Sequence, residues 1–135
     1  MEKMELIPKL QTMHIQGKIQ IPIQEGFMFL KADDIQYVEA DNTYSTFYLD
    51  DGSKIVSSKN IGYYEEHLKS LNFMRIHHSH IVNLNKMYKF IKGNDCYVML
   101  DSQKVLRVSR SYKDELLEIF RRTPYVPKKS KKDRE

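Results

Sequence analysis

The chain has 135 residues and a hydrophobic share of 41%, which suits one small domain with one core. It has no apolar run near the ~18 residues of a membrane span, nothing like a signal peptide at its start, and a single cysteine, Cys96. One cysteine excludes an internal disulfide and fits a reducing compartment, so we expect a cytoplasmic protein that does not associate with a membrane.

The net charge of +4 is unevenly distributed. Residues 121–135 carry seven basic and two acidic side chains, whereas residues 1–58 carry five basic and nine acidic ones. Residues 59–120 carry ten basic and seven acidic side chains. A basic second half is compatible with nucleic-acid binding, but charge alone indicates a solvated surface equally well.

Most of the expected elements are β-strands. Residues 18–23 alternate apolar and polar side chains with a period of two, and a turn at 24–26 leads into a second apolar strand. Asp50-Asp51-Gly52-Ser53 is a strong hairpin signal. The remaining predicted strands share β-branched and aromatic enrichment and lie at 35–40, 44–49, 54–57, 88–91, 96–100 and 105–108.

Two short helices are expected. Asn60 can cap the first, whose apolar stripe recurs at spacings of three and four residues, at Ile61, Tyr64, Leu68 and Leu71. The second is predicted at 112–121, where Ser111 to Asp114 resembles a capping box. Its buried face would consist of Tyr112, Leu116, Ile119 and Phe120.

The residues between Arg75 and Asn83 contain an arginine, three histidines, a serine and an asparagine. Such a density of donors suits a surface that contacts phosphates and base edges. The alternative is a polar turn beside a half-buried strand. His78 and His80 would share one face of a strand, but a zinc site needs further ligands, and no Cys-x-x-Cys or His-Glu-x-x-His spacing is present. No catalytic motif supports an enzyme, and we expect no metal or cofactor.

Three ordered motifs together resemble the LytTR family of bacterial DNA-binding domains. The family hallmark Phe-x-Arg-x-His-x-Ser-x-x-Val-Asn is matched by Phe73-Met74-Arg75-Ile76-His77-His78-Ser79-His80-Ile81-Val82-Asn83. The upstream segment 35–40 is similar to the family's Ile-x-Tyr-Ile-Glu-Ala, and Val108-Ser109-Arg110 is similar to its closing Val-Ser-Arg. The resemblance covers residues 19–120 and implies a mainly β, elongated domain of several small antiparallel sheets with two short helices.

The resemblance also implies how DNA would be read, from loops and short segments instead of a recognition helix. Base contacts are expected from Ser45 or its loop neighbours, from His78, and from Arg110, whose fork matches guanine O6 and N7. Plausible phosphate contacts are those of Lys59, Arg75, His77 and Ser79. Arg110 could instead pair with Asp114 on its own helix, and Asn83 is expected to hold a turn.

The predicted organisation has three parts. Residues 1–17 are a linker or short amphipathic segment, 18–121 the DNA-binding domain, and 122–135 a basic tail expected to be disordered. Family members bind imperfect direct repeats as two copies, so the expected partners are promoter DNA and a second copy of the chain. A receiver domain or histidine kinase would act upstream, since residues 1–17 cannot hold a receiver. The chain is thus either a free-standing regulator or the output half of a longer one.

A protein-interaction module without specific DNA readout is the alternative function. The two differ in salt dependence, because contacts to DNA phosphates release counterions and an apolar protein interface does not.

Overall fold

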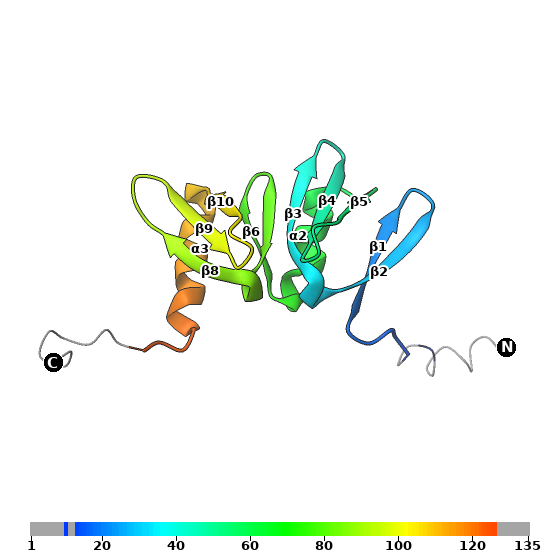
Figure 1. Cartoon of the computed structure of the whole chain (residues 1–135), viewed down its shortest axis with the longest axis horizontal. Helices are drawn as coiled ribbons and strands as arrows, with labels where there is room; N and C mark the ends of the chain where they lie inside the picture. Colours follow the sequence, from blue (N-terminus) through cyan, green and yellow to red (C-terminus); the bar gives the residue numbers. More distant parts are fainter. Residues whose placement is uncertain (1–9, 11–12, 127–135) are drawn as a thin grey trace, which may run out of the picture.

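The computed structural model describes residue 10 and residues 13–126 of the chain (Figure 1). In this part the chain is mainly β, with three separate antiparallel sheets that follow one another along the long axis of the molecule. The predicted segments 1–17 and 122–135 fall largely on residues outside the described part.

The first sheet is a hairpin of β1 (Lys18–Ile23) and β2 (Gly26–Lys31). The second has the order β5-β4-β3-β7-β6, with bounds β3 (Ile35–Asp41), β4 (Tyr44–Leu49), β5 (Lys54–Ser57), β6 (Phe73–His77) and β7 (His80–Asn83). The third has the order β10-β9-β8, with bounds β8 (Met87–Ile91), β9 (Cys96–Leu100) and β10 (Val105–Val108).

Two α-helices lie in the described part, α2 (Ile61–His67) and α3 (Arg110–Arg122). Asn60 caps α2 as predicted, its side chain accepting a hydrogen bond from the Tyr63 amide at 2.9 Å. The predicted apolar stripe is one turn too long, because α2 ends at His67 and Leu71 lies in a following 3-10 turn (Lys69–Leu71) with 42% of its surface exposed.

The second helix begins two residues earlier than predicted. Its N-cap is Ser109, in extended backbone and without a side-chain capping bond, so the capping box at Ser111 is wrong. The buried face is close to the prediction, with Leu116 fully buried and Ile119 and Phe120 partly buried against the same core.

The hydrophobic core is divided into two clusters by the β6–β7 hairpin. Alternation along β7 turns Val82 toward the three-stranded sheet and α3, and it turns Ile81 toward α2, β3 and β4. The first cluster also holds Leu116 and Cys96, and the second holds Phe47 and Tyr64. The hairpin therefore packs against both clusters, one on each face, and its turn projects from the middle of the molecule (Figure 1).

Candidate nucleic-acid interface

Three segments far apart in the sequence end on the same edge of the molecule. Figure 1 shows the β3–β4 turn, the β6–β7 turn and the start of α3 along its upper edge. Backbone hydrogen bonds tie them together, since the Ala40 amide donates to the Ser79 carbonyl at 2.9 Å and the Ser109 amide donates to the Ile76 carbonyl at 2.8 Å. The middle turn is thereby fixed to its neighbour on each side.

The hallmark run is itself the central hairpin of this edge. The zinc hypothesis placed His78 and His80 on one face of a strand, but His78 and Ser79 form the turn between β6 and β7, as the alternative of a polar turn beside a half-buried strand predicted. The turn carries His78 outward, where its side chain is exposed and its ring has no hydrogen-bond partner among the described residues. His78 is therefore free to meet a ligand from outside.

Arg110 is the first residue of α3 and is exposed. The alternative prediction of a pair with Asp114 is not observed, because Arg110 makes no ion pair within the described part of the chain. Arg110 directly follows Ser109, whose amide is bonded to Ile76 of β6, and the donors of its guanidinium make no ion pair in that part of the chain.

Ser45 does not fit the predicted base contact. Its side chain is completely buried, and its hydroxyl donates to the Lys59 carbonyl at 2.8 Å. The cause is strand alternation, because Ser45 shares the inward face of β4 with the buried Phe47. Thr43 in the turn before β4 and Tyr44 at the start of β4 are exposed.

Arg75 is also placed differently from the prediction of a phosphate contact. Its side chain is only 13% exposed, and its guanidinium donates to the Glu65 carboxylate at 2.8 Å and to the His78 carbonyl at 2.6 Å. A third bond reaches the His77 carbonyl at 3.3 Å. Arg75 is therefore occupied in holding the turn from within.

The other predicted phosphate contacts lie near the turns. Lys59 is exposed beside the β3–β4 end, with its ammonium 5.5 Å from the centre of the Tyr63 ring. His77 Nδ1 accepts a hydrogen bond from the Ser79 amide at 3.0 Å. Burial, together with the nearby His80 and Arg107, lowers the pKa of His77. A neutral His77 whose Nδ1 is an acceptor carries its proton on Nε2 and can donate it.

Sequence reasoning gave Glu39 no role beyond its place in a motif. Glu39 is the cross-strand partner of His80, and its carboxylate meets His80 Nε2 at 2.8 Å and the Tyr48 hydroxyl at 3.1 Å. Burial opposes ionisation, but hydrogen bonds from His80 and Tyr48, together with the electrostatic effect of His80 and Lys104, lower the pKa of Glu39. Glu39 and His80 are separated by 41 positions in the sequence, so no local pattern predicts this pair.

Asn83 has the structural role predicted for it. The residue is 1% exposed, and its amide donates to the Ile35 carbonyl at 2.9 Å and to the Ala32 carbonyl at 3.2 Å. Its oxygen accepts from the Asn85 amide at 3.0 Å, which caps the 3-10 turn after β7 (Leu84–Lys86). Asn83 thus joins β7 to the beginning of β3.

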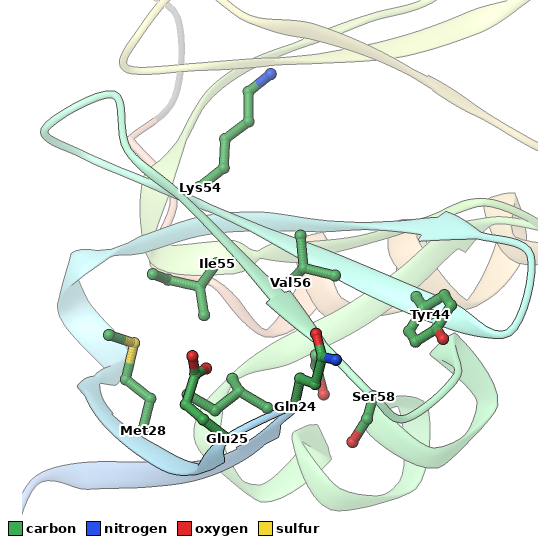
Figure 2. Close-up of a pocket in the computed structure, with 10 residues that line it drawn as sticks. Gln24, Glu25, Met28, Tyr44, Lys54, Ile55, Val56 and Ser58 are labelled. Atoms are coloured by element: carbon green, nitrogen blue, oxygen red, sulfur yellow. The ribbon is translucent and has the colours of Figure 1, made fainter.

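A groove of about 540 Å³ lies beside this edge, between the β1–β2 hairpin and β5. Figure 2 shows Gln24, Glu25 and Met28 of the hairpin near Ile55 and Val56 of β5. The lining is mainly apolar, with Glu25 and Lys54 as its charged members.

No helix among the described residues is long and apolar enough to cross a membrane. No group of three or more His, Cys, Asp or Glu side chains in the same part of the chain is arranged to hold a metal ion.

Comparison with known proteins identifies the class. The family model of the LytTr DNA-binding domain matches residues 25–121, so the chain belongs to the LytTr DNA-binding domain family. A solved structure described as the LytTr DNA-binding domain of a response regulator from Bacillus cereus has the same fold, with a TM-score of 0.66 and 18% sequence identity. The match covers 78% of this chain and 98% of the other. The search of curated proteins gave no match.

Proposed function

We propose that this domain binds double-stranded DNA sequence-specifically as a bacterial transcription regulator of the response-regulator type. The observation that carries the proposal is the row of three linked segments on one edge, in a member of a DNA-binding family. An edge that presents turns and a helix start can reach base edges in a groove without a recognition helix.

In this proposal His78 and Arg110 read bases. Both are exposed and free of competing ion pairs in the described part of the chain, and the bond from Ser109 to Ile76 keeps the two segments together. Arg110 would recognise guanine, and the exposed Thr43 and Tyr44 would replace Ser45 as the contacts from the β3–β4 turn.

Phosphate contacts would fix the register of the domain on DNA. Lys59 supplies a cation near the β3–β4 turn, and His77 and Ser79 supply donors near the central turn. We further propose that two copies occupy imperfect direct repeats, and that a receiver domain or histidine kinase controls the regulator. The response-regulator description of the Bacillus cereus protein supports that last point.

One observation favours the alternative of a protein-interaction module. Phe27 and Phe29 are 60% and 42% exposed and share the outer face of β2, at the end of the molecule away from α3. Binding through this face would depend weakly on salt, whereas binding of the basic edge to DNA would weaken steeply as salt rises.

The test is selection of binding sites from a random duplex pool at near-physiological salt. Wild type should enrich a repeated motif, and Arg110→Ala should lose one position of it and weaken specific binding by about 1–3 kcal/mol. The matched control is Arg122→Ala, an exposed arginine at the opposite end of the same helix, which should enrich the wild-type motif. Absence of any enriched sequence with the wild type would refute the proposal.

A further inference from the structure

The turn that carries His78 is held by a pair of hydrogen-bonded side chains on each face of the hairpin. On one face, Arg75 donates to Glu65 of α2 and to the carbonyl of His78 itself. On the other face, His80, the residue that follows the turn, meets Glu39 of β3. The two carboxylates come from different elements, and the pairs share no residue.

The first pair acts directly on the backbone of the turn. Arg75 Nη2 lies 2.6 Å from the His78 carbonyl and Nε lies 3.3 Å from the His77 carbonyl, while Nη1 lies 2.8 Å from Glu65. A guanidinium is a rigid fork, so fixing one nitrogen on Glu65 fixes the direction of the other two. With 13% of its side chain exposed, Arg75 is not placed to bind a phosphate itself.

The second pair fixes the other arm of the hairpin. Glu39 uses both carboxylate oxygens, one for His80 Nε2 at 2.8 Å and one for the Tyr48 hydroxyl at 3.1 Å. Tyr48 is held in turn by stacking on Tyr37, with the ring centres 4.4 Å apart. His80 Nδ1 is buried without a partner, so its bond to Glu39 is the one that orients the ring.

We infer that Arg75 with Glu65, and His80 with Glu39, are positioning residues that set the His78 turn in its DNA-reading geometry before DNA arrives. The inference rests on the proposed function for its consequence, which is specificity. A turn held in place loses little freedom on binding, so the interaction energy with the correct base is retained. Without these pairs the turn must be ordered at the moment of binding.

The experiment uses four variants of the full chain. Glu65→Ala removes the carboxylate behind Arg75, and Glu66→Ala is its matched control, an adjacent exposed glutamate of the same helix that makes no ion pair in the described part of the chain. Glu39→Ala removes the acceptor for His80, and Glu39→Gln is the conservative variant that keeps a hydrogen-bonding side chain there.

Two quantities are measured for each variant. One is the backbone ¹⁵N order parameter of His78 and Ser79 in the free protein, which needs no DNA. The other is the ratio of affinities for the selected duplex and for a random duplex of equal length. Glu65→Ala and Glu39→Ala should each lower the order parameters and reduce the affinity ratio about three- to tenfold. Glu66→Ala and Glu39→Gln should match the wild type in both.

The outcomes separate this inference from the proposed function. If the wild type selects no sequence, the proposed function fails. If the wild type is specific but Glu65→Ala and Glu39→Ala retain its order parameters or its affinity ratio, the inference is overturned while the function stands. Where an alanine variant does not fold, Arg75→Lys replaces Glu65→Ala, because a lysine has no fork to span Glu65 and the turn carbonyls, and His80→Phe replaces Glu39→Ala, because phenylalanine cannot bond to Glu39; the same two quantities decide.

Discussion

Replacing Asn83 tests most clearly whether a hallmark residue has a structural role or contacts DNA. The perturbation is Asn83→Ala, which removes an almost fully buried amide with three hydrogen bonds, to the backbone of Ala32, Ile35 and Asn85. We expect a large loss of stability with no change in the sequence that the folded protein prefers.

The magnitude follows from the three bonds. Each contributes about 0.5–1.5 kcal/mol net, and loss of one partner leaves the buried backbone groups unsatisfied, so the unfolding free energy should fall by about 2–4 kcal/mol. In a domain of this size each kcal/mol corresponds to about 4–8 °C, which gives a decrease in melting temperature of roughly 8–32 °C. Asn83→Asp should be equally destabilising, since a carboxylate cannot donate to the carbonyls of Ala32 and Ile35.

The assay is urea unfolding followed by far-ultraviolet circular dichroism, with Asn94→Ala as the control. Asn94 is an exposed asparagine in the β8–β9 loop, and its replacement should change stability by less than about 0.5 kcal/mol. The reasoning is refuted if Asn83→Ala keeps the wild-type stability. It is also refuted if the folded variant selects a different DNA sequence, because Asn83 would then contact bases.

Three further results are expected. The pKa of His77 is lower in the folded protein than in the unfolded chain, so the free energy of unfolding should decline as pH falls below about 6.5 toward the folded-state pKa. His77→Gln should flatten this decline, and equal pH profiles of unfolding for the variant and the wild type would contradict the prediction. Ser45→Ala should lower the free energy of unfolding by about 1 kcal/mol through loss of the bond to the Lys59 carbonyl, and it should leave the selected DNA motif unchanged. If the variant instead keeps the wild-type stability and loses a base preference, Ser45 is a base contact. Lys59→Ala should weaken binding to all duplexes alike and reduce the slope of log K against log[salt] by about 0.9, so a loss confined to one sequence would argue against a phosphate contact.

The strands were predictable because their signals are local. Period-two alternation in 18–23 and the Asp50-Asp51-Gly52-Ser53 turn lie within a few residues, and the structure has a strand or a turn at each. The family assignment rested on ordered motifs and is confirmed by the family match over 25–121. The start of α3 was missed because Ser109 and Ser111 both suit an N-cap and only Ser111 is followed three positions later by an acidic residue, whereas the helix begins after Ser109.

The site could be predicted only in part, and the errors have different causes. The burial of Ser45 was predictable in principle, because Phe47 two positions later is a core residue and must lie on the same face of the strand. The ion pair of Arg75 with Glu65 was not predictable, because it depends on α2 bringing Glu65 to the hairpin. The pair of His80 and Glu39 depends on β3 pairing with β7, a long-range choice that neither strand encodes alone.

The position of the β6–β7 hairpin has a consequence for variants far from DNA. Because Ile81 and Val82 pack into different clusters, the hairpin depends on both cores for its placement. A cavity in either core therefore allows the His78 turn to shift, while the cations of the edge stay available for phosphates. Core variants that remain folded should accordingly lose discrimination between sequences before they lose general affinity for DNA, because base readout depends on geometry and phosphate attraction depends mainly on charge.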